Sequence, residues 1–563
     1  MLPERTLIRP RSSSSACHAP AAGTGFNVYR GGTKIAGPIT DSTNYLDAGA
    51  SASATYTVRA VVNGAEQAAS ATSLTFGNGY LDVPIQKPSG DYVANDGSVG
   101  DLDGDGQLEI VLKWDPTNAK DNSQAGVTCN VYVDAYKLNG TRLWRIDLGR
   151  NIRAGAHYTQ FQVYDYDGDG KAEVAMKTAD GTRSGTGQVI GDPSADYRNS
   201  SGYILSGPEY FTVFTGQTGA IGATTSYVPA RGTVSSWGDS YGNRVDRFLA
   251  GTAYLDGQRP SIIMARGYYT RAVVVAWDYR NGQLTRRWTF DSNSSTTGNS
   301  TYAGQGNHSL SVADVDGDGK QEILYGAAAI DDDGRGLWNN RTGHGDAGHV
   351  GDLIPSRPGL EYYKVTESST QPDSWMADAR TGQILWSTPA AGDNGRGVSD
   401  DIWSGSPGAE SWSSSDSQMR NTSGQTIGRK PGSTNFLAYW DGDTSRELLD
   451  GTHIDKYGTG GDTRLLTGAD VRSNNGTKST PTLSGDILGD WREEVIWARS
   501  DESALRIYAT PTPTSTRVWT LLHDQTYRVA IAWQNTAYNQ PPHTGFFLGT
   551  PFTLPAQPRI STP

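Results

Sequence analysis

The sequence predicts an all-β fold made of many short strands, and three observations carry this prediction. Glycine is unusually frequent, with 69 residues among 563, tyrosine (28) and tryptophan (15) are abundant, and long helix-forming runs are absent. A nine-residue acidic motif recurs along the chain, and each copy leads into an apolar run. Many apolar runs are also joined in pairs by Asn-Gly or Thr-Gly, which supply the left-handed backbone of tight hairpins.

The acidic motif occupies residues 101–109, 165–173 and 314–322. Carboxylates at positions 1, 3, 5 and 9 and glycines at positions 4 and 6 put several hard oxygens around one point, as calcium requires. An EF-hand loop places its glutamate at position 12 and continues into a helix, whereas here the glutamate opens a strand. The predicted calcium ligands are Asp101, Asp103, Asp105, Glu109, Asp165, Asp167, Asp169, Glu173, Asp314, Asp316, Asp318 and Glu322.

Degenerate copies of the motif occur at residues 254–262, 352–361, 440–447 and 486–494. The last two add the predicted metal ligands Asp441, Asp443, Glu447, Asp486, Asp490 and Glu494. The seven copies recur about every 64 residues, and most are followed by a hairpin. An inner strand with a calcium loop plus an outward hairpin describes a propeller blade, so residues 77–563 are predicted to form an eight-bladed β-propeller. A stacked solenoid competes, but no polar capping repeats are visible.

Three further segments carry structural expectations. The final blade should use strands at residues 505–508, 528–533 and 546–548, with a strand from the N-terminal side as an option for closure. The serine-rich residues 411–432 should form a surface loop. Residues 25–76 alternate strands around a Gly-Gly turn and resemble a small, truncated fibronectin type III sandwich, while residues 1–24 form an Arg-, Ser- and Pro-rich segment of uncertain structure.

Composition excludes several classes of function. A net charge of −12 without clusters of lysine and arginine argues against nucleic acid as a partner. No apolar run approaches the ~20 residues of a membrane span. The two cysteines offer neither a disulfide framework nor a zinc site. Low-affinity calcium sites fill at the millimolar levels found outside cells, so we expect an extracellular protein, although no signal peptide is visible. A monomer is the default expectation.

Several long peptides resemble polysaccharide lyase family 11, the rhamnogalacturonan lyases. They are residues 95–101, 111–123, 177–182, 306–309, 343–350, 392–397 and 475–478, and the resemblance runs from about residue 25 to the C-terminus. It implies an eight-bladed propeller with many calcium ions. It also implies a polysaccharide substrate, rhamnogalacturonan I, the pectin backbone of alternating rhamnose and galacturonic acid. The family cleaves its rhamnosyl-α-1,4-galacturonosyl bond by β-elimination, which leaves an unsaturated galacturonosyl end.

The chemistry of such a lyase sets two requirements. Positive charge must neutralise the uronate carboxylate while the C5 proton leaves, and calcium can supply it in addition to its structural sites. A base must also lie within hydrogen-bond reach of C5. The family pattern points to Lys478 and Arg396, both in glycine-containing loops, and leaves open which of them is the base. We assign Lys478 as the base and Arg396 as the stabilising cation, because arginine stays protonated in proteins.

Other positions match the binding motifs of the family. The substrate-binding residues implied by the resemblance are Asn95, Asp115, Asn475, Gly476, Thr477 and Tyr538. A mixed nitrogen and oxygen metal site near the channel mouth is a further hypothesis, although histidine is an unusual calcium ligand. Its members would be His308, His344, Asp346 and Glu367.

Two rival functions remain open at the level of sequence. A non-catalytic, integrin-like calcium propeller for adhesion or polysaccharide binding would keep the acidic loops but would not need Lys478 or Arg396. A pectin glycoside hydrolase would need two suitably placed carboxyl groups, which the abundant acidic residues could supply.

Overall fold

The computed structural model describes residues 6–9, 24–42, 44–48, 50–51 and 54–556. Most of the segment 1–24, for which the sequence predicted no definite structure, lies outside these residues. The all-β prediction is confirmed for the described part of the chain. Its helices are α1 (Gln525–Trp533) and the short 3-10 turns η1 (Val234–Trp237), η2 (Asn299–Tyr302), η3 (Gly476–Lys478) and η4 (Leu521–His523).

Seven four-stranded antiparallel sheets follow one another along the described chain from residue 92 to residue 467. The first three sheets consist of β9 (Tyr92–Gly100), β10 (Glu109–Pro116), β11 (Tyr132–Tyr136) and β12 (Arg142–Asp147); β13 (Phe161–Tyr164), β14 (Glu173–Ala179), β15 (Glu209–Phe214) and β16 (Ile221–Ser226); and β17 (Phe248–Ala253), β18 (Ser261–Arg266), β19 (Val273–Arg280) and β20 (Gln283–Asp291).

The other four sheets have the same plan. They consist of β21 (Ser311–Ala313), β22 (Glu322–Leu324), β23 (Ala328–Ile330) and β24 (Gly336–Asn339); β25 (Gly348–Gly351), β26 (Glu361–Val365), β28 (Ser374–Asp378) and β29 (Ile384–Ser387); β31 (Gly397–Asp400), β32 (Glu410–Ser413), β33 (Gln418–Arg420) and β34 (Thr426–Arg429); and β35 (Phe436–Ala438), β36 (Glu447–Asp450), β37 (His453–Lys456) and β38 (Thr463–Thr467). A two-stranded ribbon, β27 (Glu367–Ser368) with β30 (Gly392–Asp393), lies beside them in sequence.

The last sheet combines strands from both ends of this region. Strands β40 (Leu483–Gly485) and β39 (Val471–Arg472) pair with β41 (Glu494–Arg499), which pairs with β42 (Ala504–Tyr508). The partner of β42 on its other side is β8 (Tyr80–Pro84), in an antiparallel register that sets Tyr508 opposite Tyr80. The sheet therefore does take a strand from the N-terminal side, and residues more than 400 positions apart hold it together.

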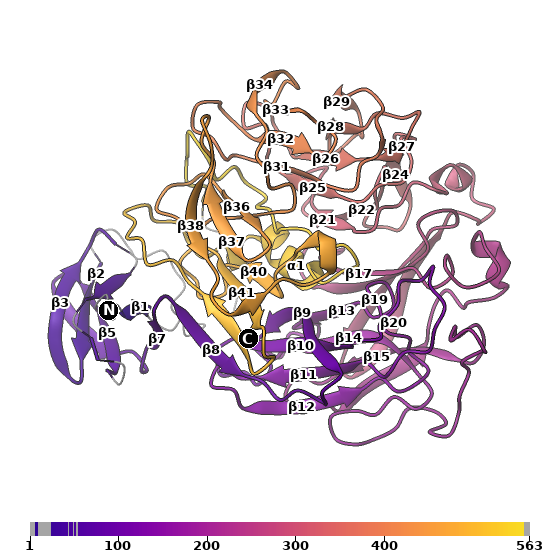
Figure 1. The fold of residues 1–563 in the computed structure, drawn as a ribbon, viewed down its shortest axis with the longest axis horizontal. Coiled ribbons are helices and arrows are strands. Elements are labelled where there is room, and N and C mark those ends of the chain that lie inside the picture. The colour runs from indigo at the N-terminus through magenta and orange to yellow at the C-terminus, as the bar shows by residue number, and fades with distance from the viewer. Residues whose placement is uncertain (1–5, 10–23, 43, 49, 52–53, 557–563) are drawn as a thin grey trace.

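The strands predicted at residues 528–533 and 546–548 are wrong, because the first segment lies within helix α1 and the second forms no strand. The Asp524 carboxylate caps the helix by accepting a hydrogen bond from the Tyr527 N–H at 3.0 Å. Seven of its nine residues are buried, so the helix shows no polar face that would reveal it in the sequence. It contacts β9, β13, β17, β21 and β40, and Figure 1 shows it among these strands.

The surface loop predicted at residues 411–432 is also wrong, because the segment contributes to β32, β33 and β34. Trp412 and Met419 from these strands are fully buried. The strands were not recognised in the sequence because the many serines weaken the alternation of apolar and polar residues that indicates a strand.

The first strands of successive sheets touch one another. Strands β9, β13, β17, β21, β25, β31 and β35 contact in that order, and β40 contacts β9. Apolar side chains fill the spaces between the sheets, as with the cluster that joins Phe211, Trp277 and Phe248. Five of these strands, β9, β13, β17, β21 and β40, also contact α1 (Figure 1). Among the described residues, no helix has the length and apolar character to cross a membrane.

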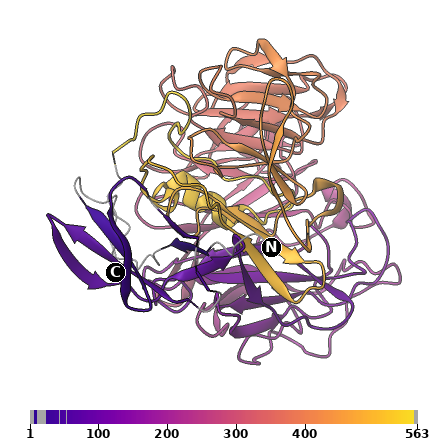
Figure 2. The ribbon, with the colours of Figure 1, turned by 60° about the vertical axis from the view of Figure 1, so that its left-hand side comes forward.

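A separate sheet precedes this body. Strands β2 (Gly25–Arg30), β3 (Thr33–Ile39), β5 (Tyr56–Val62) and β6 (Ala65–Ala69) form it, around a small core that includes Val28 and Tyr56. Strands β1 (Thr6–Arg9), β4 (Tyr45–Asp47) and β7 (Leu74–Gly77) pair together and connect to β8. In both views this part projects from one side of the body (Figures 1 and 2).

Candidate active site

Lys478 ends the 3-10 turn η3, between β39 and β40. Its Nζ donates to Asp346 Oδ2 at 2.9 Å and to the carbonyl oxygen of Gly395 at 2.7 Å. The same nitrogen lies 4.2 Å from the centroid of the Tyr538 ring. The side chain is 21% exposed, so it is held in place but still reachable from solvent.

Arg396 follows Gly395 in the loop between β30 and β31. It lines a pocket together with Lys478, and Asn435, Thr480, Asn539 and Gln540 complete much of the wall. Within the part of the chain that the structure describes, no carboxylate pairs with its guanidinium. The structure thus brings together the two residues that the sequence singled out as base and cation.

The predicted substrate-binding residues gather on the same side of the molecule. The Asn475 Nδ2 donates to Asp96 Oδ1 at 3.0 Å and to Asn539 Oδ1 at 3.1 Å, and Asn95 Nδ2 donates to the Asn475 Oδ1 at 3.3 Å. These contacts link η3 to β9. Asp96 also accepts from buried Lys113 at 2.8 Å. Sequence reasoning missed Asp96, Lys113 and Asn539, although the first stands directly after Asn95.

The other residues of this group differ in exposure. Gly476 and Thr477 are exposed at the turn, where they can be reached by a large ligand. Asp115 belongs to the same electrostatic surroundings as Lys113 and Asp96. Its Oδ1 is buried without a hydrogen-bond partner, and this burial raises the pKa of the carboxyl. A buried oxygen without a donor is one that a cation or a sugar hydroxyl could satisfy.

His308, His344, Asp346 and Glu367 come together as the sequence suggested. One ligand atom from each lies within 4.8 Å of the others. His344 Nδ1 faces the carbonyl oxygen of Gly306, which leaves Nε2 as the acceptor nitrogen; this Nε2 is buried, lacks a hydrogen bond and lies 3.3 Å from Glu367 Oε2. Burial lowers the pKa of His344 to about 3, so the imidazole is neutral, as a metal ligand must be. The four residues therefore fit a divalent cation.

Aromatic side chains join this cluster to Lys478. The Tyr538 ring stacks on the His308 ring at 4.1 Å, and the Tyr538 N–H donates to the His308 carbonyl oxygen at 3.1 Å. The hydroxyl groups of Tyr268 and Tyr269 lie 3.0 and 2.8 Å from the two ring nitrogens of His308. Asp346 belongs to both groups, since one of its oxygens accepts from Lys478. The candidate base and the candidate metal ligands therefore form one continuous site.

Sequence reasoning missed Tyr268, Tyr269 and the residues beyond them. His157, which gave no recognisable pattern, is buried with its ring 5.2 Å from that of His308. Arg247 lies near it and pairs with Asp121 at 3.5 Å. These residues come from connections that share no motif, some between sheets and some between strands of one sheet, so only the fold brings them together.

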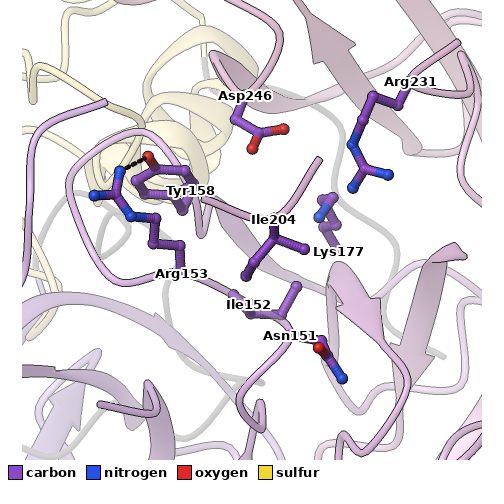
Figure 3. A pocket seen from close by; sticks show the side chains of 8 residues that line it. All are labelled: Asn151, Ile152, Arg153, Tyr158, Lys177, Ile204, Arg231 and Asp246. Atoms are coloured by element: carbon purple, nitrogen blue, oxygen red, sulfur yellow. Dashed lines mark hydrogen bonds between the residues drawn. The ribbon is translucent and has the colours of Figure 1, made fainter. Parts of the chain in front are cut away.

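A buried ionic cluster anchors the connection that leads into β17. Arg266 donates to both Glu209 oxygens at 2.6 and 3.0 Å and lies 3.4 Å from Asp246. Lys177 and Arg231 contact the same Glu209 oxygen at 3.2 and 3.0 Å. Figure 3 shows Lys177 and Arg231 pointing toward one another in the pocket that Asp246 also lines. Removing one partner from such a buried ionic network strongly lowers the free energy of unfolding, so the network holds this connection rigidly.

The three full acidic loops have the geometry of cation sites. In each, the carboxylates at positions 1, 3 and 9 of the motif lie within 4.8 Å of one another. In the first loop Asp101 accepts the N–H groups of Gly104 and Gly106, both at 2.8 Å, which curls the loop around that point. The position-5 residues Asp105, Asp169 and Asp318 each accept the N–H two residues further on.

Lysines also contact acids of two full loops, Lys137 at Asp103 and Asp105 and Lys320 at Asp318, but the acids of the two degenerate loops have more internal partners. The Lys456 Nζ lies 3.1 Å from Asp441, 2.9 Å from Asp443 and 2.6 Å from Glu447, so an ammonium group contacts all three predicted ligands. In the last loop, Asp490 pairs with Arg492 at 2.7 Å. Asp486 accepts hydrogen bonds from Thr520 Oγ1 and the Leu521 N–H, and Glu494 accepts from the Leu488 N–H. Calcium at these two loops remains a prediction and would compete with internal partners.

The acidic loops predict how calcium's stabilising effect depends on pH. Burial raises the pKa of Glu109 to about 7 and the pKa values of Glu173 and Glu322 to about 8. Without metal, the folded state binds these protons more tightly than the unfolded state, so its stability falls as pH rises through the raised pKa values. Calcium binds the ionised carboxylates, so its binding offsets this loss of stability as the pH rises. We expect the melting-temperature difference between calcium-loaded and chelated protein to grow from pH 5 to about pH 8; a constant or shrinking difference would contradict the assignment.

Comparison with known families decides how this site is interpreted. The model of the rhamnogalacturonan lyase family 11 C-terminal domain matches residues 80–558. The chain belongs to rhamnogalacturonan lyase family 11. The model of the rhamnogalacturonan I lyase β-sheet domain matches residues 16–76 of this family 11 member.

Characterised relatives of this family 11 member are similar over nearly their whole length. The rhamnogalacturonan endolyase YesW of Bacillus subtilis (strain 168) is 57% identical over 551 residues, which cover 96% of this chain and 88% of YesW. The rhamnogalacturonan exolyase YesX of the same organism is 55% identical, covering 95% and 92%. The crystal structure of YesW superimposes with a TM-score of 0.93 over 99% of this chain and 96% of its own, and a Bacillus licheniformis rhamnogalacturonan lyase gives the same score at 57% identity.

Proposed function

We propose that this family 11 member is a calcium-dependent rhamnogalacturonan lyase. It cleaves the rhamnosyl-α-1,4-galacturonosyl bond of rhamnogalacturonan I by β-elimination and leaves an unsaturated galacturonosyl end. The observation that carries the proposal is the identity of 57% and 55%, over at least 95% of this chain, with an endolyase and an exolyase of this polysaccharide. The continuous site around Lys478 and Asp346 supports it independently.

Lys478 is proposed as the base that removes the C5 proton. A neutral amine keeps two N–H groups, and Asp346 Oδ2 and the Gly395 carbonyl oxygen provide two acceptors for them. The nitrogen lone pair is then left for the substrate, on a side chain that reaches the pocket. General bases of this kind contribute about 10²- to 10⁴-fold to the rate.

Arg396 is proposed to stabilise the uronate carboxylate or the leaving oxygen on C4. It lines the Lys478 pocket, and its charge is free of carboxylate partners among the described residues. Asn95, Asp115, Asn475, Gly476, Thr477 and Tyr538 are proposed to hold the sugar units, with amide and hydroxyl groups for sugar hydroxyls.

Calcium is proposed at the acidic loops and at the group His308, His344, Asp346 and Glu367. At the latter site it would neutralise the carboxylate of the uronate whose C5 proton leaves. The protein residues do the rest: Tyr538 and Asp346 hold Lys478 in place beside the pocket. The buried, unbonded Nε2 of His344 supports a cation at this place.

The architecture is proposed to be a closed, eight-bladed β-propeller preceded by a fibronectin-III-like module, with boundaries near residues 25, 77 and 563. Seven successive four-stranded sheets, a composite sheet from both ends of the region and sequential contacts between first strands support the propeller. We further propose that the protein acts outside the cell, because its polymeric substrate is found there. We also propose that it is a monomer.

One assay separates this proposal from its rivals. The protein is incubated with rhamnogalacturonan I, with calcium or with chelator, and both ultraviolet absorbance and reducing ends are followed. A lyase produces new absorbance from unsaturated ends in the calcium sample. New reducing ends without absorbance would indicate a pectin hydrolase, and binding without either product would indicate an adhesive or carbohydrate-binding propeller.

A further inference from the structure

We propose that Arg244 forms a second uronate subsite, in which its guanidinium binds the carboxylate of a galacturonate outside the bond being cleaved. The inference rests on the proposed function, because it assumes a polymer with a carboxylate on every second sugar. It concerns a residue that lies outside the catalytic pair and outside the group of candidate metal ligands.

Arg244 borders the candidate metal cluster through one aromatic ring. Its Cζ lies 3.5 Å from the centroid of the Tyr269 ring. The same ring lies 4.1 Å from the His344 ring, and the Tyr269 hydroxyl is 2.8 Å from His308 Nε2. Lys478 reaches His308 through a different ring, that of Tyr538. Two cations therefore flank the cluster, each resting on its own tyrosine.

The charge of Arg244 has no carboxylate partner among the described residues. No ion pair or side-chain hydrogen bond is formed by its guanidinium there, in contrast to nearby Arg247, which contacts Asp121 and Asn243. Stacking on Tyr269 uses only the face of the guanidinium, so the N–H groups along its edge stay available. This planar edge matches both oxygens of a carboxylate, a geometry that lysine lacks.

The loop that carries Arg244 is held rigidly before any ligand arrives. The Asp239 carboxylate accepts the backbone N–H groups of Tyr241, Gly242, Asn243 and Arg244 at 3.1, 2.9, 3.2 and 2.7 Å. The Thr270 hydroxyl ties the start of the loop to the segment after Tyr269 by donating to the Trp237 carbonyl oxygen at 2.6 Å. A preorganised cation binds with little loss of conformational entropy, as a recognition residue should.

The repeat of the polymer supplies the ligand. When one galacturonate lies at Lys478 and Arg396, the next carboxylate along the chain is displaced by two sugar units. A second cation that is fixed beside the cluster would hold that carboxylate and so set the register of the chain across the site. Because this contact is the same before and during the reaction, its loss should raise KM and leave kcat nearly unchanged.

The test uses the calcium-loaded full chain with the substitutions Arg244→Gln and Arg335→Gln. Arg335 is the matched control, because its side chain is 83% exposed and, among the described residues, its guanidinium pairs with Asp333 alone, in a hairpin. On long rhamnogalacturonan I, R244Q should raise KM roughly 10- to 100-fold, the range for a charge-assisted hydrogen bond. On oligomers that carry a single galacturonate next to the cleaved bond, the wild type and R244Q should have similar KM values.

Two results would overturn the proposal. R244Q could leave KM on the polymer within the range of R335Q, or it could lower kcat equally on long and single-uronate substrates, which would place Arg244 at the cleaved bond. Affinity electrophoresis in gels that contain rhamnogalacturonan I measures binding without turnover. In these gels R244Q should be retained less than the wild type, and R335Q should be retained as the wild type is. If the wild type makes no unsaturated product but this difference is seen, the proposed function fails while the subsite stands.

Discussion

Lys478→Ala is expected to lower kcat by on the order of 10³-fold, the centre of the range for loss of a general base. The reason is geometric: Asp346 and the Gly395 carbonyl oxygen hold the nitrogen against Tyr538, where no other described lysine reaches the Arg396 pocket. The initial rate of ultraviolet absorbance from unsaturated ends measures the effect. Lys87→Ala, at an exposed position, is the control and should keep the wild-type rate.

Lys478→Arg separates a base from a merely structural cation. The guanidinium can still pair with Asp346 and rest on Tyr538, so a structural role would be rescued. Arginine stays protonated, however, and cannot accept the C5 proton. We therefore expect K478R to be nearly as inactive as K478A, with an unchanged melting temperature. Substantial activity of K478R, or normal product formation by K478A, would show that the base lies elsewhere.

Removing calcium is expected to abolish activity and to lower the melting temperature in the same sample. At a hundredfold excess over Kd, each cation that binds only the folded state adds about 2.7 kcal/mol to its free energy of unfolding. The three full loops each gather carboxylates of like charge. Without metal, one lysine at most among the described residues offsets this repulsion: Lys137 in the first loop and Lys320 in the third. Differential scanning calorimetry with and without chelator, followed by re-addition of calcium, measures the change. A melting temperature unaffected by chelation would contradict structural calcium.

Matched variants distinguish the two kinds of cation site. Asp165→Asn weakens the second acidic loop, so it should lower the melting temperature and leave the rate at saturating calcium largely intact. Glu367→Gln weakens the group around His344 and should reduce the rate while changing the melting temperature little, because Glu367 lies at the partly exposed side of its cluster. If both variants lose activity and stability in the same proportion, the division between structural and catalytic calcium is wrong.

Some parts of the fold and the site could be predicted from local chemistry. The acidic loops could be recognised from the sequence, because all the predicted ligands of one full loop lie within nine consecutive residues. Lys478 and Arg396 were identified from peptides that resemble one family, and His308, His344, Asp346 and Glu367 were a separate hypothesis for a metal site. The structure brings the members of each set together.

Other parts depend on packing that no local pattern records. Helix α1 is buried almost all round, so its sequence lacks the polar face that distinguishes a helix from a core strand. Arg244 and Arg247 lie in the connection between two sheets, and Tyr269 lies in a loop within one sheet. They come together only when these connections fold against one another. Asp96 was missed although it follows Asn95, because its partners Lys113 and Asn475 come from the neighbouring strand β10 and from the distant turn η3.

The masses of the products test the central claim most directly. Rhamnogalacturonan I is digested by the calcium-loaded protein, and the new ends are analysed by mass spectrometry. Elimination at the site of Lys478 predicts that every cut leaves an unsaturated galacturonosyl end, so each product pair is lighter by one water than the pair from hydrolysis. Fragments that carry the added water, with saturated galacturonosyl ends, would contradict the account.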